Sequence, residues 1–159
     1  MRIKIIVIGK LREKYFKDME AEYLKRLSRF HKIEIKELPE ECKIDTPSET
    51  EIEKALSKEA EKIISSFSRN SYKIALAIEG KNLSSEEFSS LLDNAERSGK
   101  TDVDFVIGGS HGIADKVLSE CDFLLSFSKM TFTYQMARVI LSEQLYRAAK
   151  ISANEAYHK

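Results

Sequence analysis

Two short loops in the C-terminal half of the chain combine residue types that suit ligand binding. Gly108 to Gly112 (GGSHG) has three glycines in five positions, so its backbone can adopt φ > 0 and approach a ligand closely. Ser126 to Thr131 (SFSKMT) offers hydroxyls, one cation and two apolar side chains, which suits a ligand with polar and apolar ends. Each loop follows a short apolar segment and precedes a helical pattern. Open α/β sheets bind ligands at this position.

The glycine loop does not match the common nucleotide-binding patterns. It reads GGxxG rather than GxGxxG, and no acidic residue lies near Phe132, about 20 positions further on, where a ribose partner is expected. A P-loop and a GxSxG nucleophile elbow are also absent. His31, His111 and His158 lack the spacing of metal ligands, so no metal site is expected. A strand-to-helix turn without a ligand is the alternative interpretation of GGSHG.

Composition predicts one domain over residues 1–159. The chain is 42% hydrophobic, which suffices for one full core and not for two. Its apolar runs are far shorter than the ~20 residues needed to span a bilayer, so we expect a cytoplasmic protein with no membrane contact. Cys42 and Cys121 have no ligand or disulfide spacing and are interpreted as reduced thiols.

The charges cancel overall but are unevenly distributed. There are 26 basic and 26 acidic residues, which argues against a strongly cationic nucleic-acid binder. Residues 1–36 carry 11 basic and 5 acidic side chains, residues 37–126 carry 10 and 19, and residues 127–159 carry 5 and 2. The two basic ends are either ordinary solvated helix faces or surfaces that meet a polyanion.

Apolar patterns predict strands that alternate with helices, and hence a mostly parallel sheet with helices on both faces. The expected strands are Ile3–Ile8, a half-exposed or edge strand at His31–Lys36, Tyr72–Ile78 covered on both faces, Val103–Ile107 and Phe123–Leu125. The first helix should bury one stripe, made of Tyr15, Phe16, Met19, Tyr23, Leu27 and Phe30.

Polar residues mark where the other helices begin and end. Thr46 is expected to cap a helix with Pro47 at its first position, and Ser84 to Glu87 form a capping box for the next helix, which Gly99 ends. A short helix is expected from Ala114 to Ser119. The last helix runs from after Thr133 to about Lys150. The tail after it, ISANEAYHK, shows no helical or strand period.

Three strand ends are similar, since Leu76, Ile107 and Leu125 each precede a polar or glycine-containing loop. If these strands are neighbours, their loops form one pocket. The last helix is apolar around most of its circumference, so it is either buried centrally or meets another subunit with its second face.

Four segments of the chain resemble the RlmH family of SPOUT methyltransferases. They are IVIGKLREKYFKDMEAEY near the start, IGGSHG, SFSKMTFTYQMARVILSEQLYRA and the terminal EAYHK. The resemblance covers essentially the whole chain. It implies a homodimer with a C-terminal trefoil knot that uses S-adenosyl-L-methionine to methylate N3 of a pseudouridine in 23S rRNA within the ribosome.

The resemblance also implies roles for single residues. The cofactor pocket falls on Leu76, Gly108, Phe127, Ser128, Lys129, Met130, Thr131 and Phe132. Arg147, Tyr157 and His158 would form the catalytic, substrate-facing side. Tyr134 stands where many members have His, and His111 where others have Asn or Glu, so neither is expected to be the base.

Two other functions are compatible with the same residues. The chain could be a SPOUT methyltransferase for tRNA or another rRNA site, or a ribosome-associated protein that kept the fold and lost the cofactor. The complete SFSKMTF segment favours an enzyme.

Overall fold

Strands and helices alternate along the chain, as the apolar patterns predict. The computed structural model describes residues 1–159. Its elements are β1 (Arg2–Ile8), α1 (Lys14–Leu27), β2 (Lys32–Leu38), α2 (Glu49–Ser66), β3 (Tyr72–Asn82), α3 (Ser85–Arg97), β4 (Asp102–Ile107), α4 (Asp115–Glu120), β5 (Phe123–Ser126) and α5 (Tyr134–Ser152). None of the helices has the length and apolar character needed to cross a bilayer.

The five strands form one parallel sheet in the order β2-β1-β4-β3-β5. The central strands β1 and β4 are buried along almost their whole length. In β2 the side chains alternate between exposed and half-buried positions, because this strand lies at an edge. The predicted mostly parallel sheet and the edge position of this strand are both confirmed.

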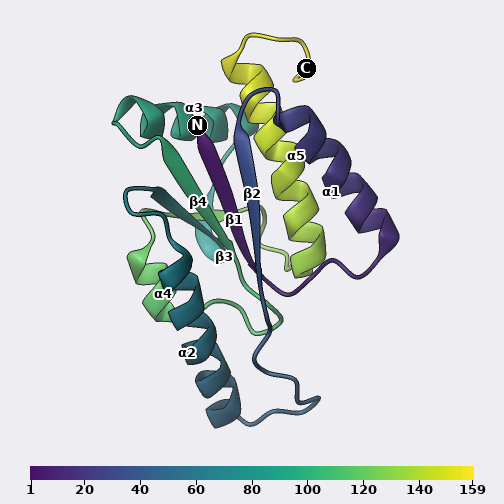
Figure 1. Cartoon of the computed structure of the whole chain (residues 1–159), viewed down its shortest axis with the longest axis vertical. Helices are drawn as coiled ribbons and strands as arrows, with labels where there is room; N and C mark the ends of the chain where they lie inside the picture. Colours follow the sequence, from purple (N-terminus) through teal and green to yellow (C-terminus); the bar gives the residue numbers. More distant parts are fainter.

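Helices cover both faces of the sheet (Figure 1). On one face α1, α3 and α5 pack on a core that includes Phe105, Leu141 and Leu145. On the other face α2 and α4 pack on a second core with Ile6, Val106 and Val117. The last helix contacts both α1 and α3, so central burial accounts for much of its apolar circumference.

Two helices begin with a complete capping box. Ser84 accepts a hydrogen bond from the backbone N–H of Glu87, whose side chain accepts one from the N–H of Ser84, as predicted. The cap of α2 is Ser48 with Glu51, two residues after the predicted Thr46. The prediction was wrong because two pairs in this segment have capping-box spacing, Thr46 with Glu49 and Ser48 with Glu51. The second pair forms the box, and its reciprocal hydrogen bonds satisfy two backbone donors.

The apolar stripe of the first helix is only partly buried, which corrects the sequence-based expectation. Leu27 is buried and Phe16 half-buried, whereas Tyr15 is 61% and Met19 47% exposed. The buried face of α1 instead carries Glu20, which pairs with Arg138 of α5. Periodicity identifies one apolar face but not the neighbour that covers it.

β3 departs from the prediction at its carboxyl end. It continues to Asn82, and both Leu76 and Lys81 are in register with Leu125, so the four residues between them leave the ladder. Ile78 is 51% exposed there, not covered on both faces. Gly80 lies against the β5 backbone, where a Cβ atom would come within 2.6 Å of the Leu124 carbonyl oxygen.

The trefoil knot expected for the C-terminal part of the chain stays a prediction.

Candidate functional site

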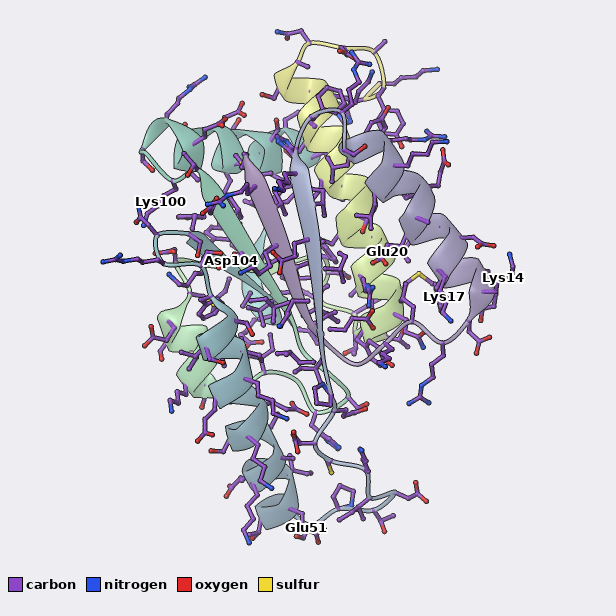
Figure 2. All side chains as sticks on the ribbon, viewed as in Figure 1. Lys14, Lys17, Glu20, Glu51, Lys100 and Asp104 are labelled. Atoms are coloured by element: carbon purple, nitrogen blue, oxygen red, sulfur yellow. The ribbon has the colours of Figure 1, made fainter.

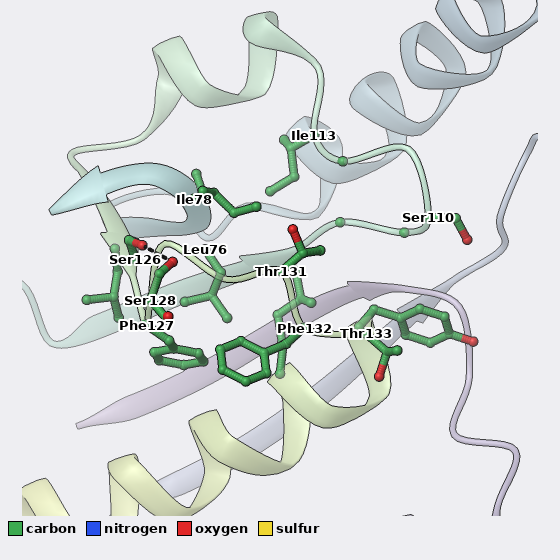
Figure 3. Close-up of a pocket in the computed structure, with 18 of the residues that line it drawn as sticks. Leu76, Ile78, Ser110, Ile113, Ser126, Phe127, Ser128, Thr131, Phe132 and Thr133 are labelled. Atoms are coloured by element: carbon green, nitrogen blue, oxygen red, sulfur yellow. Dashed lines mark hydrogen bonds between the residues drawn. The ribbon is translucent and has the colours of Figure 1, made fainter. Parts of the chain in front are cut away.

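A cavity of about 810 Å³ lies at the carboxyl ends of β3, β4 and β5, beside the start of α5 (Figure 3). Its volume is in the usual range for small-molecule sites. β4, β3 and β5 are adjacent in the sheet, so the three similar strand ends do form one pocket. This juxtaposition follows from strand order, which the sequence pattern alone does not give.

Most of the predicted cofactor residues line this cavity. They are Leu76, Gly108, Phe127, Ser128, Met130, Thr131 and Phe132. Lys129 is exposed and is not part of the lining. The cavity therefore joins two distant loops and the end of a third strand in one place.

The glycine loop folds back on itself at one wall of the cavity. A Cβ atom on Gly108 would lie 2.6 Å from the carbonyl oxygen of Gly112. Gly112 has a φ of +82° and donates its N–H to the carbonyl of Gly109 at 3.1 Å. These contacts require glycine at position 108 because any side chain would displace the loop.

Three hydrogen bonds fix the conformation of the loop that follows β5. The hydroxyl of Ser126 donates to the carbonyl of Ser128 at 2.9 Å, and the Ser128 hydroxyl accepts from the N–H of Met130 at 3.0 Å. Asn82 donates to the carbonyl of Ser126 at 2.8 Å. Within residues 127–132 the N–H of Met130 is the one backbone donor with a partner in the chain. The other N–H groups are free to bind a ligand.

Apolar side chains stand around the mouth of the cavity. Met130 is 76%, Ile78 51% and Phe132 41% exposed. Leu76 and Phe127 are half-buried and lie deeper in the lining (Figure 3). The site thus combines apolar side chains with backbone N–H groups that have no partner in the chain. This combination suits a flat heterocycle with polar edges.

Several lining residues were not singled out as ligand-binding in the sequence. Tyr134 and Gln135 come from the first turn of α5, Glu79 from the irregular part of β3, and Ile113 from the glycine loop's C-terminal end. Tyr134 donates its hydroxyl hydrogen to the carbonyl of Lys10 at 3.1 Å, so it joins α5 to the end of β1. Position within the SFSKMTFTYQ segment was the one signal that could have identified Tyr134 and Gln135.

The predicted catalytic residues form a second cluster around Glu143. Arg147 donates two hydrogen bonds to the Glu143 carboxylate, at 3.1 and 2.5 Å, and the Tyr157 hydroxyl donates to the same oxygen at 3.0 Å. The Arg147 guanidinium lies 4.7 Å from the centre of the Tyr157 ring. Burial, and then the bond to Glu143, raises the pKa of Tyr157 to about 12, so the phenol stays protonated at neutral pH.

His158 ties the end of the chain to two helices. Its Nδ1 lies 3.3 Å from Nη1 of Arg147, and its Nε2 lies 2.7 Å from Oε1 of Glu86 at the start of α3. A guanidinium only donates, so Nδ1 accepts and the neutral ring donates from Nε2 to Glu86. The pKa of Glu86 is lowered by its own backbone N–H and then by His158. The tail is therefore packed against the protein, although its sequence lacks a period.

The two clusters lie at opposite ends of α5. Tyr134 begins this helix at the cavity, and Arg147 lies 13 positions later, roughly 20 Å along the axis. Both chain termini lie at the end of the molecule away from the carboxyl ends of the strands (Figure 1). One chain does not bring the predicted catalytic residues to the predicted cofactor pocket.

Other candidate groups form neither a metal site nor a ready nucleophile. His111 is exposed in the glycine loop and lines the cavity, and no group of His, Cys, Asp or Glu side chains is arranged to hold a metal ion. Cys42 and Cys121 are free thiols. Burial raises the pKa of Cys121 to about 11, so this thiol is not a ready nucleophile.

Comparisons with known proteins find close similarity over the whole chain. Residues 1–158 match the family model described as "Predicted SPOUT methyltransferase". Proteins named "Ribosomal RNA large subunit methyltransferase H" from Clostridium acetobutylicum and Clostridioides difficile are each 48% identical over 159 residues, which is all of both chains. The protein of that name from Streptococcus uberis is 46% identical with the same coverage.

A solved structure supports the fold independently. A probable methylase family protein from Haemophilus influenzae aligns with a TM-score of 0.53 at 16% identity, covering 99% of this chain and 70% of the other. At this identity the likeness concerns the fold alone.

Proposed function

This chain belongs to the SPOUT methyltransferase family, and from that premise we propose that it methylates N3 of a pseudouridine in 23S rRNA with S-adenosyl-L-methionine as methyl donor. The observation that carries the proposal is the single cavity that gathers Leu76, Gly108 and the loop 127–132. The ribosomal substrate is proposed from the name shared by the full-length relatives. Because the chain has no net positive charge, its affinity for free RNA should be weak, and we expect it to act on the assembled ribosome.

The cavity fits the proposed methyl donor. Free backbone N–H groups in residues 127–132 can read the adenine edge, and Leu76 and Met130 can cover the ring faces. Gly108 lets the ribose or methionine portion approach the backbone. The residues present therefore match a ligand with one flat ring and one flexible end that lies close to the backbone.

The chemistry requires alignment and charge stabilisation. N3 of pseudouridine is an imide nitrogen that loses its proton as it attacks an electrophilic methyl group. S-adenosylmethionine supplies that methyl on a sulfonium sulfur that leaves as a neutral thioether. Arg147 then holds the negative charge that develops on the adjacent carbonyl oxygens, or grips a phosphate.

Tyr157 and His158 complete the substrate side. The protonated Tyr157 hydroxyl can donate to the target base or its ring can stack on it. His158 carries an imidazole, the side chain that most often transfers protons in catalysis. When Arg147 turns to the substrate it frees Nδ1 of His158, which can then position the imide or accept its proton.

A homodimer would let the tail cluster of one chain reach the cavity of the other chain. The tail of one chain is roughly 20 Å from its own cavity along α5, so we assign the tail to the partner chain's cavity. Exposed apolar side chains near the starts of α1 and α5, namely Tyr15, Met19 and Met136, supply a surface for a two-fold interface. Residues 1–159 are proposed to act as one domain of this cytoplasmic dimer.

The protein is expected to be a dimer at micromolar concentration. Burial of Tyr15 and Met19 removes apolar surface from water, and Met19→Glu places a charge there instead. Light scattering should give twice the chain mass for the wild type and one chain mass for Met19→Glu. Lys25→Glu, an exposed change on the same helix, is the control. A monomeric wild type would refute the dimer.

Two measurements test the function. Calorimetric titration with S-adenosylmethionine should show binding, whereas no binding at millimolar ligand would favour the non-catalytic alternative. Mass spectrometry of rRNA from a strain that lacks the gene should show one unmethylated pseudouridine, restored by the purified protein acting on ribosomes. If the methylation of rRNA is unchanged in this strain and that of tRNA is altered, the protein is a tRNA methyltransferase instead.

A further inference from the structure

A group of unpaired cations lies on the β1–α1 loop and the first turns of α1. Lys10, Arg12 and Lys17 are exposed, and none of their side chains has an ion-pair or hydrogen-bond partner in the chain. We call these three residues the basic rim. Lys14 lies among them and pairs with Asp18 at 2.6 Å. Figure 2 shows Lys14 and Lys17 at the start of α1, directed to solvent.

The backbone of the basic rim is fixed to the lining of the cavity. The carbonyl of Lys10 accepts the Tyr134 hydroxyl at 3.1 Å, and the N–H of Arg12 donates to Oε1 of Gln135 at 2.8 Å. Tyr134 and Gln135 both line the cavity. Leu11, between the two cations, is buried, so the loop cannot swing freely. The rim therefore lies beside the part of the cavity that Tyr134 and Gln135 line.

These cations are placed where they do not help the fold. α1 begins with Lys14 and Lys17 and has no acidic residue in its first turn. A helix N-terminus carries a partial positive charge, so cations there are unfavourable. By contrast α2 and α3 each begin with two glutamates and a capping box. Helix stability therefore does not explain the position of Lys17, the rim residue that lies in α1.

We propose that the basic rim binds backbone phosphates of the RNA that flank the target nucleotide. Exposed lysine and arginine side chains suit phosphates, which fix position without reading sequence. The middle of the chain is a poorer candidate for phosphate binding, because residues 37–126 carry 19 acidic against 10 basic side chains. This inference rests on the proposed function, since it assumes an RNA whose target base enters the cavity.

The test compares two triple variants that remove the same charge. Lys10→Ala/Arg12→Ala/Lys17→Ala removes the rim, and Lys54→Ala/Arg69→Ala/Lys116→Ala is the control. The control residues are exposed, lack ion pairs, and lie in or near α2 and α4 on the other face of the sheet. Binding is measured to large ribosomal subunits purified from a strain that lacks the gene, over a series of salt concentrations.

The rim variant should bind at least about tenfold more weakly at low salt, and its slope of log affinity against log salt should fall by about 2 to 3, one step per lost phosphate contact. The control should bind within twofold of the wild type. Both variants should bind S-adenosylmethionine normally by calorimetry, which shows that the cavity remains folded.

Equal effects of the two variants, or an unchanged salt slope in the rim variant, would overturn the inference. Failure of the proposed function looks different. In that case the wild type would not methylate the subunits. Tight wild-type binding with an intact rim effect would then still support phosphate contacts.

Discussion

Removal of Tyr157 to Lys159 is expected to lower methyl transfer to ribosomes by at least about 100-fold, the usual cost of losing a positioned acid–base group. S-adenosylmethionine affinity should stay within a few-fold, because none of these residues lines the cavity of its own chain and the partner's tail is assigned to the substrate side. Single-turnover methylation and calorimetry measure the two quantities. Arg147→Ala should behave like the truncation, since it removes the cation of the same cluster.

The matched control is removal of Lys159 alone, because this side chain is exposed and forms no ion pair or hydrogen bond. A truncated protein that turns over normally would show that the tail has no catalytic part.

The shared site can be tested by mixing two inactive proteins. The tail-truncated chain keeps its cavity, and Gly108→Val keeps its tail but loses the cavity wall, since its side chain would collide with Gly112. In a mixed dimer the intact tail can reach the intact cavity, which restores one of its two sites. Activity should therefore return to about one quarter of wild type, because roughly half the dimers become mixed. No recovery after verified subunit exchange would place the tail and the cavity in separate roles.

The second large effect concerns stability. Arg138→Met is expected to lower the free energy of unfolding by about 3–5 kcal/mol, because it leaves a buried carboxylate without its cation. Arg138 is 3% and Glu20 6% exposed. Nε and Nη2 of Arg138 both donate to the Glu20 carboxylate, the latter at 2.8 Å, and Nη1 lies 3.5 Å from Glu37.

The double variant Glu20→Met/Arg138→Met is the control, and it should recover most of the lost stability because two apolar side chains replace the pair. Urea unfolding at one fixed protein concentration provides the comparison, since dimer stability depends on concentration. A loss below about 1 kcal/mol in Arg138→Met, or a double variant as unstable as the single one, would show that the pair is solvated rather than buried.

Features that depend on near neighbours in the chain could be predicted from the sequence. Strand and helix patterns predicted the alternation and the parallel sheet, since periods of two and of 3.6 reflect local geometry. The capping box at Ser84 was found because its partner Glu87 lies three residues away. The loop residues at 108 and 127–132 were recognised from composition and family resemblance, and all but Lys129 line one cavity.

Which surfaces meet could not be predicted from local patterns and became clear from the fold. Strand order placed the three loops together, while Tyr15 and Met19 kept the spacing of a buried stripe and yet remain exposed. Glu20 and Arg138 look like solvated helix charges, but their burial depends on residues more than a hundred positions apart. The tail has no period of its own, and Glu143 and Glu86 hold it in place. Burial and pairing are properties of neighbours in space, which a local pattern does not encode.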